Sequence, residues 1–185
     1  LVEMIKPNGW LIINHDDARL RELKPKLAEH LADKKIKVIS YGFDPEADLA
    51  VSNDSPIYNT VEEKKVPAGW QAKVNYRDDS LPLRLNNIFS RQQAYAPLVA
   101  LAVGWVLKLN FLNLTAELEN YQLPPGRGRL IKGLKGSWLI DDTYNSSPAA
   151  LEAALVGLGQ LEITGRKIAV IGDMLELGEH TIKAH

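Results

Sequence analysis

Residues 136–185 read GSWLIDDTYNSSPAALEAALVGLGQLEITGRKIAVIGDMLELGEHTIKAH, and this stretch decides the fold class. A short apolar run at 138–140 is followed by a polar loop, and residues 148–158 then carry Ala and Leu at helical spacing. Ser147 precedes a proline and is the expected N-cap of this helix. A second apolar run, rich in β-branched residues, occupies 167–171. We therefore expect strand, helix and strand, a right-handed βαβ unit of an α/β fold.

Acidic residues follow both expected strands of this unit. Asp141 and Asp142 come directly after the first strand, and Asp173 follows the second. Ligands of open parallel sheets bind beyond the carboxyl ends of the strands, where these acids could meet ribose hydroxyls, a metal or a cationic amine. The same residues would also suit helix N-termini as caps. Spacing alone leaves both interpretations open.

Composition limits the class of protein. The 185 residues carry a formal net charge of −1, contain no cysteine and are 45% hydrophobic. No basic surface for nucleic acid is indicated, and disulfides and thiolate metal sites are excluded. No apolar run reaches the roughly 18 residues of a membrane span, and the N-terminus does not read as a signal peptide. We expect a cytoplasmic protein, and the abrupt ends suggest a piece of a longer chain.

The N-terminal residues repeat the pattern of the opening stretch. An apolar strand is expected at 10–13, a helix interrupted by Pro25 at 18–32, and another strand at 36–40. Asn14 stands at the carboxyl end of the first strand. Spacing alone indicates a turn or cap residue there.

The middle of the chain reads as short strands followed by a long helix. Partial alternation predicts strands at 48–51, 70–76 and 81–85, with a solvated turn at 62–65. A long apolar helix is expected at 86–109.

Two strings resemble a known family. IDDTYNSSP at 140–148 and IAVIGDMLELGEH at 168–180 are similar to the C-terminal domain of the Mur ligases, ATP-dependent enzymes that add amino acids to the peptidoglycan precursor. The string at 172–180 resembles the branch that joins D-alanyl-D-alanine to UDP-N-acetylmuramoyl-tripeptide. The resemblance implies that residues 1–124 are part of a central P-loop-type ATPase domain with a β-rich segment. Residues 125–185 would then begin a Rossmann-like C-terminal domain.

The resemblance also implies a set of ATP-contacting residues. Asn14 begins an Asn-x-Asp-Asp string and would contact the adenine base, and Asp16 and Asp17, its acids, would cap the next helix. Arg127 lies in a Pro-x-Gly-Arg string and would reach the nucleotide phosphates, a task for which a guanidinium is suited. Asp142 would face the ribose. Tyr144 and Asn145 would line the nucleotide side of the C-terminal domain.

Other parts of the family's machinery are absent or altered here. No G-x-x-x-x-G-K-[ST] phosphate loop occurs in the sequence, so this loop and the Mg²⁺ ligands are expected upstream, and no catalytic residue is assigned within the chain. Ser90, Gln92 and Ser147 depart from the family's Gly, His and Asn. The substrate-side residues, facing the amine or the peptide, would be Asp173, Glu176 and Glu179.

The resemblance further implies a monomer that binds UDP-N-acetylmuramoyl-tripeptide and D-alanyl-D-alanine. Three alternatives remain open at this point. The chain could come from another Mur ligase or a folylpolyglutamate synthase, or be a nucleotide-binding relic without catalysis. An aspartyl phosphatase is the third, although adjacent acids such as Asp141 and Asp142 point to opposite faces of a strand.

Overall fold

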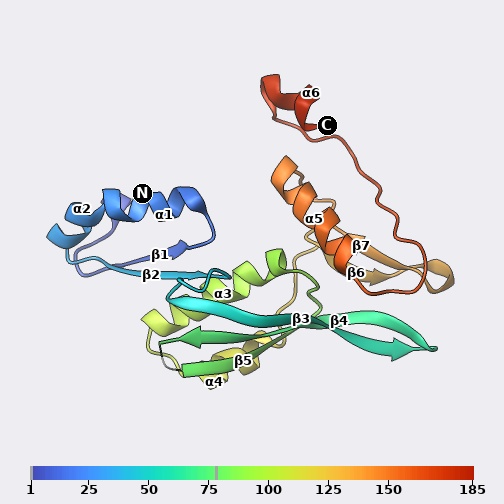
Figure 1. Cartoon of the computed structure of the whole chain (residues 1–185), viewed down its shortest axis with the longest axis horizontal. Coiled ribbons are helices and arrows are strands. Elements are labelled where there is room, and N and C mark those ends of the chain that lie inside the picture. The colour runs from blue at the N-terminus through green and yellow to red at the C-terminus, as the bar shows by residue number, and fades with distance from the viewer. Residues whose placement is uncertain (1, 78) are drawn as a thin grey trace. The chain divides into compact units, whose positions relative to one another are not determined.

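The structure, a computed structural model shown in Figure 1, describes residues 2–77 and 79–185. The chain divides into two compact units. The first unit comprises the chain up to Ser55 together with residues 71–84 and 95–120. The second comprises residues 56–70, 85–94 and 121–185. The predicted domain boundary after residue 124 stays a prediction.

The first unit opens with the expected βαβ arrangement. After a short 3₁₀ turn at Val2–Met4, strand β1 (Trp10–Asn14) pairs in parallel with β2 (Lys37–Gly42). Helices α1 (Ala18–Lys26) and α2 (Ala28–Asp33) connect the two strands. The two predicted strands are confirmed. The predicted helix is interrupted, as expected. The interruption lies at Leu27 and not at Pro25, which α1 accommodates in its last turn.

The sheet continues through three longer strands. Its order is β1-β2-β3-β4-β5, with β3 at Leu49–Val61, β4 at Lys64–Tyr76 and β5 at Asp79–Asn86. β3 pairs in parallel with β2. Glu62 and Glu63 link β3 to β4 with φ values of 49° and 64°, and two residues with positive φ form the tight turn of an antiparallel hairpin. The predicted α/β class with a β-rich segment is confirmed, and the strands are longer than expected.

Helix α3 (Arg91–Val106) supplies much of the core. In the first unit, its side chains Leu98, Leu101 and Ala102 are fully buried. Leu49 of β3 is also fully buried, and Leu83 of β5 is almost fully buried. The helix begins later than expected because β5 extends to Asn86. A capped helix, α4 (Phe111–Leu118), follows it.

The second unit contains a small antiparallel sheet and one long helix. β6 (Arg129–Lys132) pairs with β7 (Trp138–Asp141) across a 3₁₀ turn at Leu134–Gly136. Helix α5 spans Pro148–Gln160, and the Ser147 hydroxyl accepts a hydrogen bond from the Ala150 backbone N–H at 3.3 Å. The predicted helix and its cap are confirmed.

The predicted strand at 167–171 is wrong. This segment has no regular secondary structure, and Ile168, Val170 and Ile171 are 67%, 96% and 54% exposed. β7, its expected neighbour, pairs with the antiparallel β6 instead. A β-branched run becomes a strand only where another strand accepts its hydrogen bonds, and the described part of the second unit provides none. The βαβ unit expected here is therefore not formed.

The chain closes with a 3₁₀ turn at Gly178–His180 and a short helix α6 (Thr181–Ala184). Across residues 2–77 and 79–185, every helix is too short or too polar to cross a bilayer.

Candidate functional site

Asn14 lies at the carboxyl ends of the parallel strands, the edge of the sheet at which a ligand is expected to bind. It ends β1 and is paired with Tyr41 of β2, at the carboxyl edge of both strands. Its side-chain oxygen accepts a hydrogen bond from the Asp16 backbone N–H at 3.0 Å, so Asn14 forms the turn that spacing alone indicated. Its predicted contact with the adenine base stays a prediction.

The two acids after Asn14 have different tasks. Asp17 caps α1, because its carboxylate accepts from the backbone N–H groups of Arg19 and Leu20 at 2.8 and 3.2 Å. The expectation that Asp16 also caps the helix is wrong. Its carboxylate turns toward β2 and α3, where it accepts from the Phe43 and Asp44 backbone N–H groups. The cap needs only one acid, which leaves the other for a contact more distant in sequence.

Tyr41 and Tyr95 lie near the Asp16 carboxylate. The Tyr95 hydroxyl donates to the Asp16 carboxylate at 2.7 Å, and the ring centroids of Tyr41 and Tyr95 are 6.4 Å apart. Burial, and next the negative charge of Asp16, raise the pKa of the Tyr41 hydroxyl. Tyr41 therefore remains a neutral hydrogen-bonding group at physiological pH.

In the second unit, hydrogen bonds from the loop that carries Arg127 to Asp141 of β7 and to Tyr144 hold this loop in place. Gly126 and Gly128 have φ values of 72° and 78°, so the arginine stands between two left-handed residues. The Gly128 N–H donates to the Asp141 carbonyl at 2.8 Å, and the Gly126 N–H donates to the Asp141 carboxylate at 3.2 Å. The Tyr144 N–H donates to the Gly126 carbonyl at 3.1 Å. These bonds fix the backbone on both sides of Arg127.

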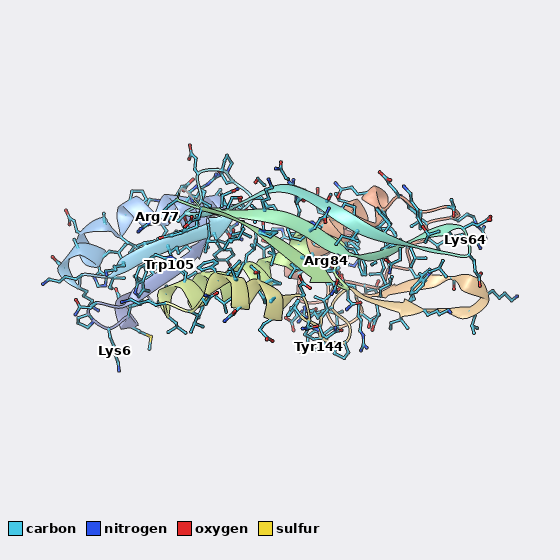
Figure 2. The ribbon with its side chains drawn as sticks, turned by 90° about the horizontal axis from the view of Figure 1, so that it is seen from below. Lys6, Lys64, Arg77, Arg84, Trp105 and Tyr144 are labelled. Atoms are coloured by element: carbon cyan, nitrogen blue, oxygen red, sulfur yellow. The ribbon has the colours of Figure 1, made fainter. Side chains whose placement is uncertain are left out.

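Arg127, Asp142 and Tyr144 come together at this loop. The Arg127 guanidinium carbon is 4.2 Å from the centre of the Tyr144 ring. Tyr144, which is labelled in Figure 2, is 71% exposed. Asp142 is exposed to solvent, and partial desolvation raises the pKa of its carboxyl, a rise that the positive charge of Arg127 opposes. The neighbouring Asp141 has a lowered pKa, chiefly because the Thr143 hydroxyl donates to it. A cation, an aromatic face and a carboxylate thus converge on one exposed surface.

Asn145, the remaining predicted ATP contact, lies in the same loop. Its side-chain oxygen accepts from the Ser146 N–H at 2.9 Å, which makes it a turn residue. The assignment of all five ATP-contacting residues stays a prediction.

Gln93 is a residue that the sequence did not single out. Its side-chain oxygen accepts from the Phe89 N–H at 2.7 Å, and its amide nitrogen donates to the Gly128 carbonyl at 3.0 Å. It therefore supports the loop of Arg127 from α3. Gln92 stands at the His position of the broken Gly-x-His string and is exposed, whereas the adjacent Gln93 makes the contact with the loop.

The predicted substrate-side acids lie on the irregular C-terminal segment. Asp173, Glu176 and Glu179 are all exposed. Asp173 does not end a strand, contrary to the expectation, because the strand before it is not formed. A carboxylate oxygen of Glu179 lies 3.8 Å from the Nε2 atom of His180. Their role toward the amine or the peptide stays a prediction.

A cavity of about 430 Å³ lies elsewhere in the first unit. Its lining includes Trp10 and Lys37, which begin β1 and β2, so it opens at the opposite strand ends from Asn14. Arg77 and Trp105, labelled in Figure 2, also line it. Its aromatic rings are engaged with each other, since the Trp10 and Trp105 centroids are 5.1 Å apart. Strand polarity favours Asn14 over this hollow as the ligand site.

The described residues do not fit the implied Mg²⁺. One group of potential ligands has its donor atoms within 4.8 Å of one another: His15, Asp44 and Glu46. Asp44 is already paired with Arg21 at 2.8 Å, and Glu46 is exposed. Mg²⁺ prefers an octahedron of oxygen ligands, and an imidazole beside an arginine does not supply one. These three residues therefore do not provide a site for Mg²⁺.

Solved structures show which class of protein has this fold. A MurF structure from Acinetobacter baumannii superposes with a TM-score of 0.77 over 96% of this chain and 35% of its own, at 24% identity. A MurF ligase from Thermotoga maritima in complex with ADP gives 0.71 over 97% of this chain and 36% of its own, at 23% identity. The fold is therefore that of a Mur ligase, as expected.

The sequence comparison narrows the resemblance to one type of Mur ligase. No family model matches the chain. The UDP-N-acetylmuramoyl-tripeptide–D-alanyl-D-alanine ligase of Bacillus subtilis is 25% identical over 97% of this chain, which covers 42% of that relative. The chain thus spans about two fifths of the length of this relative. The predicted resemblance to a MurF-type ligase is confirmed.

Proposed function

We propose that this chain forms part of an ATP-dependent ligase that joins D-alanyl-D-alanine to UDP-N-acetylmuramoyl-tripeptide. ATP would convert the free carboxylate of the tripeptide to an acyl phosphate. The amine of D-alanyl-D-alanine would attack it, and phosphate would leave. The observation that carries the proposal is the pinned loop of Arg127 beside Asp142 and Tyr144, in a chain similar to such ligases over nearly its whole length.

Each predicted ATP-contacting residue has a task of its own in this proposal. The Arg127 guanidinium pairs with phosphate oxygens and neutralises their charge, which is the main requirement of phosphoryl transfer. The Asp142 carboxylate accepts from ribose hydroxyls. The Asn14 carboxamide contacts the base. Mg²⁺, which supplies further charge neutralisation at the phosphates, is held by residues outside this chain. The monomeric state and the cytoplasmic location belong to the same proposal.

Nucleotide titrations test the phosphate contact. Changing Arg127 to Ala should weaken ATP binding by about tenfold or more, the size of one charge-assisted hydrogen-bond pair, and leave adenosine binding unchanged. Arg166→Ala is a matched control, because Arg166 is also an exposed arginine of the second unit. Equal ATP affinities of the wild type and Arg127→Ala would overturn the assignment. Sustained phosphate release by the chain alone, with all three substrates, would contradict the expectation that the phosphate loop lies elsewhere.

The amine donor can be tested separately. NMR titration with D-alanyl-D-alanine should move the backbone signals of residues 173–179, and L-alanyl-L-alanine should not. Shifts that are equal for the two dipeptides, or absent for both, would remove the substrate-side role of this segment.

A further inference from the structure

The Asp16 carboxylate is a junction of three structural elements. Its two oxygens accept from the Phe43 and Asp44 backbone N–H groups, each at 2.8 Å. One of them also accepts from the Tyr95 hydroxyl at 2.7 Å. The carboxylate therefore links the end of β1, the loop after β2 and helix α3. Hydrogen bonds to a charged group are about twice as strong as neutral ones, so this junction is a rigid one.

Gly42 leaves the space that the junction requires. A Cβ atom built on Gly42 would lie 2.7 Å from both carboxylate oxygens of Asp16, closer than real contacts allow. The aromatic rings complete the enclosure, since the Phe43 and Tyr95 centroids are 5.4 Å apart in an edge-to-face arrangement. The position of the carboxylate is thus set by backbone and packing together.

The junction determines how Asn14 presents its side chain. The Asp16 backbone N–H donates to the Asn14 side-chain oxygen at 3.0 Å, and an N–H can pair only with the oxygen of a carboxamide. The amide NH₂ group of Asn14 consequently points away from Asp16. The adjacent His15 N–H donates to the Tyr41 carbonyl at 2.8 Å, which ties the same turn to β2.

We propose that Asp16 and Tyr95 are positioning residues for nucleotide recognition: they hold Asn14 so that its amide NH₂ group donates to a ring-nitrogen acceptor of the purine base. This inference rests on the proposed function, because it takes Asn14 as the base contact. It adds that the hydroxyl of Tyr95, on a helix far along the chain, sets the affinity for the base without touching it.

Tyr95→Phe tests the inference while keeping the aromatic packing. Titrations of the 185-residue chain with adenosine, followed by ¹⁵N NMR, should show the Asn14 side-chain NH₂ signals displaced and adenosine binding weakened by about two- to tenfold, the equivalent of one net hydrogen bond. Tyr121→Phe removes the same atom from another tyrosine of the chain and should change neither quantity. Asp16→Asn should cause a larger loss than Tyr95→Phe, because a carboxamide cannot accept all three hydrogen bonds.

The outcomes separate the two proposals. If the wild type binds adenosine and Tyr95→Phe binds it equally well with unmoved Asn14 signals, the positioning role is overturned and the proposed function stands. If wild-type binding leaves the Asn14 signals unmoved, the base contact itself is refuted, and the positioning role with it. Circular dichroism at the titration temperature shows that each variant is folded, and Tyr95→Phe keeps the test valid if Asp16→Asn does not fold.

Discussion

The guanidinium carbon of Arg127 lies 4.2 Å from the centre of the Tyr144 ring, within the range of a cation–π interaction. An exposed ring in this position limits the directions that a flexible arginine can take. Tyr144 thereby prepares Arg127 for an anion, and a ligand that finds the guanidinium already oriented loses less entropy on binding.

Replacing the aromatic face of Tyr144 should therefore weaken ATP binding. Exposed cation–π contacts contribute about 0.5–1 kcal/mol, so Tyr144→Leu should lower the ATP affinity about two- to fivefold. Tyr144→Phe keeps the ring and should behave as the wild type. Isothermal titration calorimetry measures both, and tighter binding by Tyr144→Leu would show that the ring withholds Arg127 from the ligand.

The charge of Arg127 should be visible in the titration of Asp142. Removing it in Arg127→Ala should raise the pKa of the Asp142 carboxyl further, because the guanidinium opposes the effect of burial. Arg129→Ala is the matched control, since Arg129 acts on Asp141 and holds its pKa down. Carboxyl ¹³C NMR follows both groups, and an unchanged Asp142 pKa in Arg127→Ala would contradict the proximity of the two charges.

The same shifts predict how stability depends on pH. A raised folded-state pKa means that Asp142 favours folding while it is protonated, and this contribution is lost as the pH rises through that pKa. The lowered pKa of Asp141 has the opposite sign: its contribution is present at higher pH and is lost as the pH falls through the folded-state value. Between acid and neutral pH, the stability of Asp142→Asn should therefore change in a more favourable direction than that of the wild type, which thermal unfolding measures.

Loss of the N-cap of α5 should destabilise the second unit. Ser147→Ala removes the acceptor for the Ala150 N–H and should cost about 1 kcal/mol. Ser147→Asn, which restores the family's residue, also caps helices well and should cost little. Ser146→Ala is the control, because the bond recorded for Ser146 uses its backbone. Urea unfolding followed by circular dichroism distinguishes them, and equal midpoints for the alanine variants would refute the cap.

A methyl group on Gly128 should be far more damaging than one on Gly136. Both glycines have positive φ, 78° and 71°, so alanine at either incurs about 1–2 kcal/mol of left-handed strain. A Cβ on Gly128 would also collide with the Gln93 side-chain amide, whereas Gly136 has open space around it. The difference between the two unfolding free energies isolates the loss of the Gln93 contact, and no difference would show that Gln93 simply moves aside.

Much of the fold followed from the apolar pattern. The helix after Ser147 was predictable because its cap and its helical spacing are local in sequence. The strands that begin at Trp10 and Lys37 were predictable because each apolar run finds the other as its parallel partner. The prediction of a strand at 167–171 failed, because a strand requires a partner strand that its own residues do not encode.

The predicted ATP-contacting residues and the residues that support them divide in the same way. Asn14 and Arg127 stand in short strings that can be read directly, and the structure gives both an ordered backbone. The supporting residues could not be found so simply. Gln93 reaches Gly128 and Tyr95 reaches Asp16, pairs separated by 35 and 79 positions along the chain.

The uncovered run at 167–171 has a consequence for the behaviour of the chain at high concentration. Ile168, Val170 and Ile171 present β-branched side chains to solvent on an irregular segment that pairs with no strand in the described structure. Segments of this kind serve as templates on which a second molecule can add its own strand. Dilute solutions, or a charged residue introduced at Val170, should accordingly keep the protein free of aggregates during purification.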